Sequence, residues 1–266
     1  MDVAVLDRSA VSGRSHLHLA APRAKLLAFA LLLASIVVTT NLFVVLALLL
    51  VLLALVAAER LPARSMLPLA AYPAIFAAVF AFASAPDALA AALIVAKAVT
   101  AALAAVTLMF TTPYPQVFAA VQRVTPGLVG DALLMTYRAI FILADKLADL
   151  TRAIRLRAGI AGTHPVRSAK ATTRALGGLL LYSVDLAQRE YDVLVLRGYS
   201  GRLKVAEHPS RSPITDRMLV AGALALLGVA TVWRIYWIGL IDYSWMLPAL
   251  ALLGLGATFL FRGRKR

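Results

Sequence analysis

The sequence contains no cysteine, which excludes disulfide bonds, thiolate metal sites and cysteine nucleophiles. It also lacks a Gly-x-x-x-x-Gly-Lys-Ser/Thr loop, so the chain has no cradle of the usual kind for nucleotide phosphates. Acidic residues are scarce, with 13 against 27 lysines and arginines, and the net charge is +14. These absences predict a basic protein that does not itself hydrolyse nucleotides.

Apolar residues dominate what is present. They make up 62% of the chain, compared with about 45–50% in ordinary soluble domains, and the mean hydropathy is +0.85. A helix that crosses a bilayer needs about 17 to 25 mostly apolar residues, and several runs reach that length. The sequence therefore predicts an all-α, polytopic membrane protein with about six transmembrane helices. The predicted spans are a hairpin within 25–58, which breaks at 39–41, followed by 66–83, 88–110, 218–238 and 242–261.

The positive charges predict the orientation, because lysine and arginine in short loops stay on the cytoplasmic side. Of the 27 cations, 25 precede the first span, follow the hairpin, lie in 111–217 or belong to the C-terminal tail. We therefore expect a multi-pass plasma-membrane protein with both termini in the cytoplasm and an uncleaved first span. Anionic lipid headgroups explain the surplus charge, so no nucleic-acid partner is expected.

The chain is thus expected to divide into three regions: an N-terminal transmembrane region with four spans (1–110), a basic cytoplasmic region (111–217), and a C-terminal transmembrane hairpin with a basic tail (218–266). The middle region predicts two long helices rather than a soluble core. The first helix covers 131–157, with Asp131 as its N-cap, and the second covers 166–197, with Gly198 as a left-handed terminator.

Each predicted helix ends in a similar motif, Leu156-Arg157-Ala158 in the first and Leu196-Arg197-Gly198 in the second. A terminal arginine has a simple explanation, since the negative end of a helix dipole stabilises a cation by about 0.3–1 kcal/mol. Two such ends facing the cytoplasm favour a second explanation. A guanidinium at the tip of a rigid helix is suited to bidentate contact with a carboxylate, so we expect both motifs to dock a cytoplasmic partner.

Three groups of residues carry a resemblance to a known family. They are Pro22-Arg23-Ala24-Lys25-Leu26-Leu27 before the first span; Thr111-Thr112-Pro113, Pro126 and Tyr137-Arg138 in the stretch that leads into the first long helix and its first turns; and 187–192 (AQREYD) running into 196–202 (LRGYSGR). Together they resemble the transmembrane T component of energy-coupling factor (ECF) transporters, the EcfT/CbiQ family. Leu156 and Leu196 depart from the family pattern, which usually has a small residue before each arginine.

The resemblance implies a scaffold that couples ATP hydrolysis to transport. Its two coupling helices would dock two ABC-type ATPase subunits, and its membrane helices would hold a small membrane-embedded substrate-binding subunit. The residues implied in ATPase docking are Leu156, Arg157, Ala158, Leu196, Arg197 and Gly198. The substrate, whether cobalt, nickel or a vitamin, would be determined by the separate subunit.

Two alternatives compete with this interpretation. A conventional ABC permease would bind its own solute, but the predicted spans offer few polar groups for a central cavity. A membrane-embedded enzyme would need convergent polar groups, and the candidates are His16 and His18 in the basic N-terminal segment and Asp145 and Asp149 beside cations. We therefore expect no enzymatic activity, no catalytic or metal-binding residues and no cofactor.

Lys97 is an ionisable residue inside a predicted span, which makes it a functional candidate by default. It could contact another helix or subunit across the bilayer. It could equally snorkel or pair with a backbone carbonyl of its own chain, and the sequence does not separate these alternatives.

Overall fold

A computed structural model describes residues 16–122, 127–156, 165–201, 203, 213–236 and 243–263. Within these ranges the regular secondary structure is helical, which confirms the all-α prediction. The chain forms two compact units, one made of Met1–Val117 together with His208–Arg266, and the other of Phe118–Glu207. Both ends of the sequence thus belong to one unit, while the middle forms its own. The three-region division at residues 110 and 217 stays a prediction.

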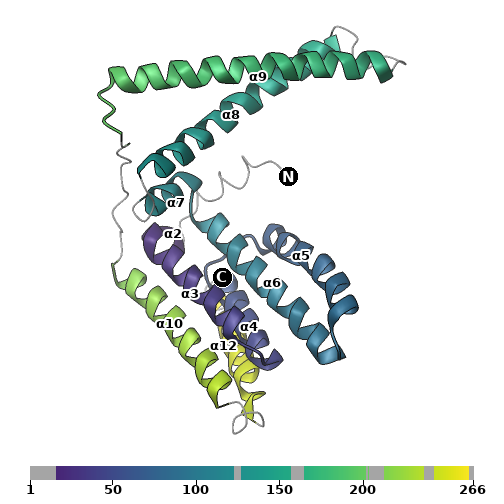
Figure 1. Cartoon of the computed structure of the whole chain (residues 1–266). Coiled ribbons are helices and arrows are strands. Elements are labelled where there is room, and N and C mark those ends of the chain that lie inside the picture. Colours follow the sequence, from purple (N-terminus) through teal and green to yellow (C-terminus); the bar gives the residue numbers. More distant parts are fainter. Residues whose placement is uncertain are drawn as a thin grey trace. The chain divides into compact units, whose positions relative to one another are not determined.

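The first unit contains the apolar helices (Figure 1). Six of them occupy the six predicted stretches: α3 (Pro22–Val38), α4 (Leu42–Ala58), α5 (Ala63–Ser84), α6 (Ala88–Thr111), α10 (Pro213–Ile235) and α12 (Met246–Gly263). By length and composition, α5, α6 and α10 are able to cross a membrane, and α4 and the Met246–Gly256 part of α12 are shorter apolar helices. A short helix, α2 (His16–Leu19), precedes α3. The chain is therefore a polytopic helical membrane protein.

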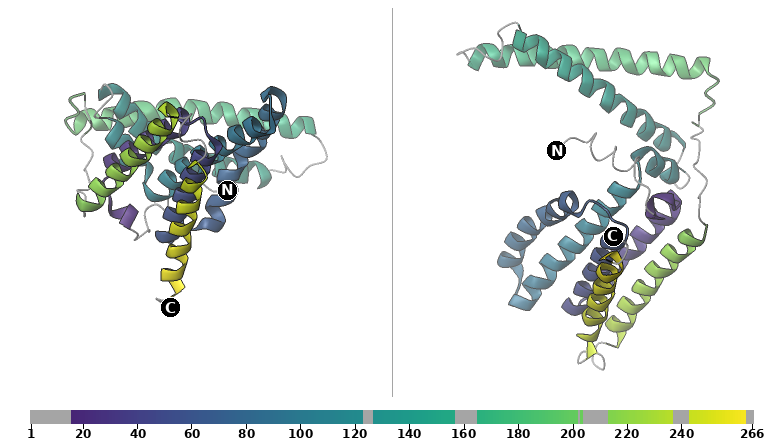
Figure 2. Two further views of the ribbon diagram at one scale, coloured as in Figure 1. Left: turned by 90° about the horizontal axis from the view of Figure 1, so that it is seen from below. Right: turned by 180° about the vertical axis from the view of Figure 1, so that it is seen from behind.

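The break predicted at 39–41 separates α3 from α4. The Thr39 hydroxyl donates to the Ser35 carbonyl at 2.8 Å and closes α3, and the Asn41 side chain accepts from the Phe43 amide at 2.9 Å and caps α4. The two helices do not pair chiefly with each other, because α3 packs along α10 and α4 packs along α12 (Figures 1 and 2). The predicted hairpin is therefore two helices that belong to neighbouring pairs.

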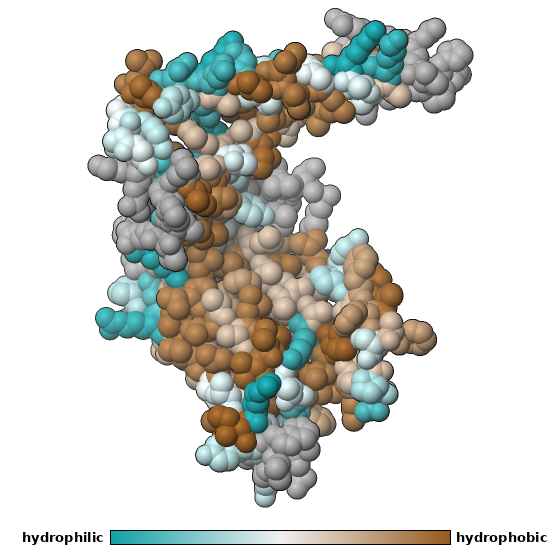
Figure 3. Space-filling model, in the orientation of Figure 1, coloured by the Kyte–Doolittle hydropathy of each residue, from teal (hydrophilic) through white to brown (hydrophobic). Residues whose placement is uncertain are grey.

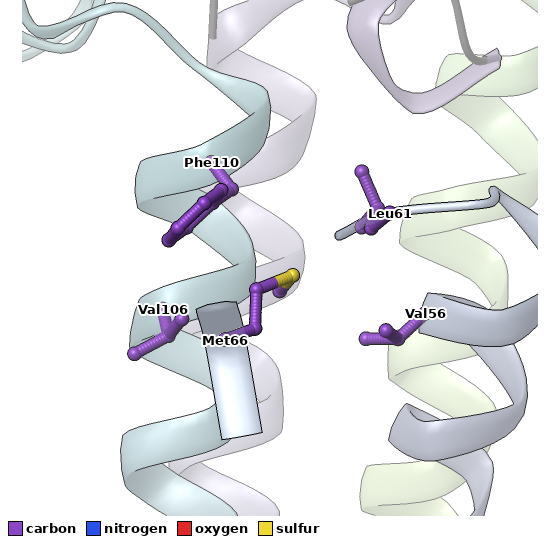
Figure 4. Packing of buried hydrophobic residues seen from close by; sticks show 5 residues of the cluster. All are labelled: Val56, Leu61, Met66, Val106 and Phe110. Carbon is purple, nitrogen blue, oxygen red and sulfur yellow. The ribbon is translucent and has the colours of Figure 1, made fainter. Parts of the chain in front are cut away.

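The core of this unit lies between α4, α5 and α6. Met66 from α5 is fully buried and inserts between Val106 and Phe110 of α6 on one side and Val56 and Leu61 on the other (Figure 4). A second cluster continues this contact along the same helices with Leu52, Ala70, Leu103 and Ala104. The outer faces of these helices also carry exposed apolar residues, and Figure 3 shows hydrophobic residues over most of the face of this unit that is in view. A surface of this kind suits a lipid environment.

The second unit is built on two long amphipathic helices, α8 (Gly127–Leu156) and α9 (Pro165–Leu196), which follow the short helix α7 (Tyr114–Val121). At about 1.5 Å per residue, the 30 residues of α8 and the 32 residues of α9 reach about 45 and 48 Å. The prediction of two long helices is confirmed. The prediction that Asp131 is the N-cap of the first one is wrong, because α8 begins at Gly127 and Asp131 lies inside it.

Residue contacts show that α8 and α9 run antiparallel. Arg138 pairs with Glu190 at 3.2 Å between Nε and Oε1, and the Lys146 ammonium lies 5.2 Å from the centre of the Tyr182 ring. Between these two contacts the chain advances eight residues along α8 and retreats eight along α9. The C-terminal ends of the two helices therefore point in opposite directions, and each end carries one of the two arginine motifs.

Candidate functional site

The C-terminal end of α9 is terminated by glycine, as the sequence predicts. Gly198 has φ of +80°, a left-handed conformation that costs residues with a side chain about 1–2 kcal/mol. Its amide donates to the Val195 carbonyl at 3.0 Å, and the Tyr199 amide donates to the Leu194 carbonyl at 3.0 Å. These two bonds form a Schellman motif, which fixes the direction in which the chain leaves the helix just beyond Arg197.

The arginine motif at this end is open to solvent. Leu196 is 86% exposed, and Arg197 is exposed as well. Among the described residues, no carboxylate forms an ion pair with Arg197. An exposed leucine beside such a guanidinium combines an apolar contact with a charged one, as a docking residue would.

Arg197 also lines a groove between α8 and α9 with a volume of about 370 Å³. Its walls are apolar with basic residues among them, and the lining residues are Leu134, Met135, Arg138, Arg189, Glu190, Val193, Leu194, Arg197 and Leu203. Two of the three arginines are engaged, because Arg138 pairs with Glu190 at 3.2 Å and Arg189 pairs with Asp185 at 2.8 Å. Arg197 is thus the lining arginine whose guanidinium is not committed to a carboxylate among the described residues.

A polar cluster lies close to this groove and has Asp131 at its centre. Asp131 is only 2% exposed. Its carboxylate accepts hydrogen bonds from Gln122 Nε2 at 2.6 Å, from the Tyr199 hydroxyl at 2.7 Å and from the Leu203 amide at 3.0 Å. The hydrogen bond to Asp131 raises the pKa of Tyr199 above its ordinary value, because ionisation would remove the donor and place a phenolate beside a carboxylate.

This cluster was missed by sequence reasoning, which gave Asp131 a capping role. Its partners are 9 to 72 residues away along the chain, and helical periodicity carries no information about such pairs. The usable signal is Tyr199, a side chain with a hydroxyl between two glycines, Gly198 and Gly201, that both adopt positive φ.

The first arginine motif lies at the opposite end of the helix pair. Leu156 is the last residue of α8, while Arg157 and Ala158 lie outside the described residues. Because α8 and α9 run antiparallel, the structure does not bring Leu156 together with Leu196, Arg197 and Gly198. Leu156 and Leu196 therefore lie at opposite ends of the α8–α9 pair.

Lys97 has a partner within the chain. Its ammonium donates to the Val37 carbonyl at 3.3 Å, and the Arg234 guanidinium donates to the neighbouring Val38 carbonyl at 2.7 Å. Val37 and Val38 are the last two residues of α3, whose carbonyls have no partner within the helix. Two cations from α6 and α10 therefore satisfy the end of α3, which favours pairing with a carbonyl, one of the two alternatives left open for Lys97.

A similar arrangement holds the end of α6, from which the chain leaves for α7. The buried Lys25 ammonium donates to the Thr111 carbonyl at 2.9 Å, and His18 Nε2 lies 3.2 Å from the Phe110 carbonyl. Asp216 accepts from the Ala21 amide at 2.7 Å and so connects α10 to the start of α3. Sequence reasoning noted Lys25 as part of a motif and as one of the cations that set the orientation, and its contact with a carbonyl 86 residues away was not predicted.

Among the described residues, no group of three or more histidine, aspartate or glutamate side chains could hold a metal ion.

Comparison with known proteins assigns the chain to a family. A family model described as CbiQ, cobalt transport protein, matches residues 13–208. The chain belongs to the CbiQ family. This confirms the resemblance carried by the sequence motifs and makes the chain a membrane transport protein. The match covers Lys25, the Asp131 cluster and both arginine motifs, so all the features described here except the Arg234 contact and Asp216 lie inside the region shared with the CbiQ family.

A curated relative supports the assignment. The cobalt transport protein CbiQ of Rhodobacter capsulatus is 30% identical over 119 residues. The aligned part is 44% of this chain and 48% of the relative, so it spans about half the length of that CbiQ protein. The CbiQ family is one of transport proteins, in keeping with the expectation that the chain is not an enzyme.

Proposed function

We propose that this chain is the transmembrane coupling subunit of an ECF-type ABC importer. It transmits movement from two cytoplasmic ABC-type ATPase subunits to a small substrate-binding membrane subunit. It resides in the plasma membrane with both termini in the cytoplasm, as the distribution of its positive charges favours.

The observation that carries the ATPase part of the proposal is the exposed Arg197 at the end of a 32-residue helix. The Schellman motif fixes its backbone, and its guanidinium can bind a carboxylate in a bidentate manner. A helix of this length moves as a lever, so a displacement of the docked ATPase would reach the far end of α9. Leu196 and Gly198 give this contact an apolar side and a close approach. Leu156, Arg157 and Ala158 would form the equivalent contact at the end of α8.

The exposed apolar side of α9 supports a second partner. Leu176, Leu180 and Val184 follow one another at spacings of four residues and are 51%, 67% and 54% exposed. Gly177 and Gly178 have open space around their α-carbons, so another helix can approach closely there. An exposed apolar stripe on a helix that also carries exposed charged residues calls for a covering surface, and a very hydrophobic substrate-binding subunit would provide one.

Cobalt is the substrate that the comparisons favour, because the family model and the Rhodobacter capsulatus relative are both named for cobalt transport. In this proposal the ion is the cargo of the complex. Its binding site belongs to the separate subunit, and this chain supplies the movement that releases it.

Co-expression with the ABC-type ATPases of the source genome tests the proposal. Replacing both Arg157 and Arg197 with glutamate should leave insertion into the membrane intact and abolish recovery of the ATPases in detergent, because a charge reversal opposite a carboxylate costs several kcal/mol. The matched control is Lys146→Glu, a charge reversal at an exposed position in the middle of α8. Lys146 lies about 15 Å along the helix from Leu156 at about 1.5 Å per residue and is level with Tyr182, away from both arginine motifs. Undiminished recovery with the double variant would reject the docking role.

A further inference from the structure

We propose that Asp131 is a positioning residue for the docking end of α9. It holds the segment that follows Arg197 against the start of α8, and thereby sets the direction in which the Arg197 motif is presented. This inference rests on the proposed function for its consequence in transport, although the contacts themselves do not depend on it.

Asp131 joins three separate segments of the chain. Gln122 lies at the end of α7, Asp131 is the fifth residue of α8, and Tyr199 and Leu203 follow α9. A carboxylate only accepts hydrogen bonds, so the Gln122 amide, the Tyr199 hydroxyl and the Leu203 amide must all point at it. Gln122 Nε2 also donates to the Leu203 carbonyl at 3.1 Å. Leu203 is therefore held through both its amide and its carbonyl.

Gly130 has no side chain, and this lets Gln122 come close enough to α8 to bind Asp131. A β-carbon on Gly130 would lie 2.2 Å from Cγ of Gln122 and 3.1 Å from its α-carbon. Such distances force the backbone of Gln122 to move. The close approach of α7 to the first turns of α8 therefore requires glycine at this position, and the cluster depends on a backbone contact as well as on hydrogen bonds.

The register between α8 and α9 brings Asp131 close to Arg197. Asp131 stands seven residues before Arg138, and Arg197 stands seven residues after Glu190, the partner of Arg138. In antiparallel helices this places Asp131 at the level of Arg197. Asp131 then binds Tyr199, two residues beyond Arg197, and Leu203, which lines the same groove as Arg197. A movement of Gln122 or Asp131 therefore displaces Tyr199 and Leu203, which lie next to the docking motif, through direct hydrogen bonds.

The segment that follows α9 contains two glycines and depends on Asp131 for a fixed conformation. Gly198 and Gly201 both have positive φ, and glycine has access to more backbone conformations than any other residue. The Schellman bonds fix the chain only as far as Tyr199, so the residues that follow keep one direction only when other groups hold them. The buried carboxylate of Asp131 supplies that hold within the described part of the second unit.

Spin-label distances in the full-length protein test this role. The sequence has no cysteine, so Ala144→Cys and Ser200→Cys introduce the only two labelling sites, both at exposed positions. We expect Asp131→Ala to broaden the distance distribution and to shift its mean. Gly130→Ala should act in the same way from the other side of the cluster. Tyr199→Phe, which removes one hydrogen bond and keeps the ring, should broaden the distribution less.

Two further variants separate positioning from general stability. Asp131→Asn keeps a carbonyl oxygen that can accept from Gln122 and Leu203, and the new side-chain NH₂ group can donate to the Tyr199 hydroxyl. This variant should therefore retain most of the native distance distribution. Asp149→Asn alters an exposed carboxylate of the same helix and should change nothing. A distribution in the Asp131→Ala and Tyr199→Phe proteins identical to that of the parent would overturn the positioning role.

The affinity for the ATPases, measured with the co-expressed subunits, connects this role to function. If Asp131→Ala reduces the docking-competent population to about one tenth, the apparent Kd rises about tenfold. A broadened distribution with unchanged affinity, while Arg197→Glu abolishes binding, would overturn the inference and leave the proposed function intact. Unchanged affinity in both variants would instead reject ATPase docking at this end of α9, and with it the functional part of the inference.

Discussion

The two units treat their charged and apolar side chains in different ways. In the first unit, Lys25, Lys97 and Arg234 donate to the carbonyls at the ends of α6 and α3. In the second unit, charged groups at the surface bind each other, as in Arg138–Glu190 and Arg189–Asp185, while the buried carboxylate of Asp131 binds neutral donors. Helix-end carbonyls without water need donors from the protein, whereas helices in water can leave them to solvent. The choice of partner therefore reports the surroundings of each unit.

Exposed apolar residues also carry different meanings in the two units. In the first unit they surround the helices, as expected for contact with lipid. In the second they lie among exposed polar and charged residues of the long helices (Figure 3). An exposed leucine therefore indicates a partner protein only where the residues around it on the surface are polar or charged.

The largest expected effect tests this distinction with one substitution in each unit. Phe76 in the middle of α5 is 65% exposed and Leu180 on α9 is 67% exposed. Phe76→Asp places a carboxylate in a span, which costs about 2.5–3.5 kcal/mol near a helix centre, so the amount of protein in the membrane fraction should fall. Leu180→Asp should leave that amount unchanged and reduce recovery of the substrate-binding subunit. Equal losses of membrane-inserted protein would remove the contrast between the units.

The next effect concerns Lys25. Lys25→Ala leaves the buried Thr111 carbonyl without its donor, and an unsatisfied buried group costs about 1–3 kcal/mol. The free energy of unfolding in detergent should fall by about that amount. Arg64→Ala, at an exposed position in the first turn of α5, serves as the control and should have little effect. Lys97→Ala should cost less than Lys25→Ala, because Lys97 is less buried. An unfolding free energy unaffected by Lys25→Ala would show that water reaches the end of α6.

A smaller effect is expected at Gly198. Gly198→Ala places a side chain at φ of +80° and should cost about 1–2 kcal/mol, visible as faster amide exchange in the last turn of α9. Gly177→Ala is the matched control, since it lies inside the same helix with open space around it and should stabilise α9 by about 0.5–1 kcal/mol. The same sign for both substitutions would contradict the Schellman motif.

The smallest effect is expected for the Arg138–Glu190 ion pair. The Arg138 side chain is 69% exposed and that of Glu190 is 18% exposed, and pairs open to water contribute about 0.2–1 kcal/mol. A double-mutant cycle with Arg138→Ala and Glu190→Ala measures the coupling energy, which should fall further in high salt. A coupling energy several times larger would mean that the second unit is less exposed to water than its surface suggests.

The sequence predicted the helices well because the relevant signals are local. Runs of apolar residues, the polar break at 39–41 and the glycine after Arg197 act within a few residues of the structure they determine. Asp131 shows where local signals fail. Its residue type and its place before a helical pattern suit an N-cap, but α8 starts four residues earlier, and the carboxylate is bound by groups up to 72 residues away.

Lys97 shows a different limit. The sequence identified it as a costly charge inside a span and could not decide what it binds. Its partner is the end of α3, and only the packing of α3 against both α6 and α10 brings Val37 and Val38 to Lys97 and Arg234. Contacts of this kind follow from how helices cross, which composition and periodicity do not specify.

The shortness of α3 has a consequence for the surrounding lipid. Its 17 residues rise about 25 Å at about 1.5 Å per residue, less than the roughly 30 Å thickness of a typical hydrocarbon core. The polar reversal at 39–41 and the two nearby cations would therefore draw headgroups inward and thin the bilayer on that side. Lipids with shorter acyl chains should relieve this mismatch, so the composition of the host membrane becomes a determinant of the protein's stability.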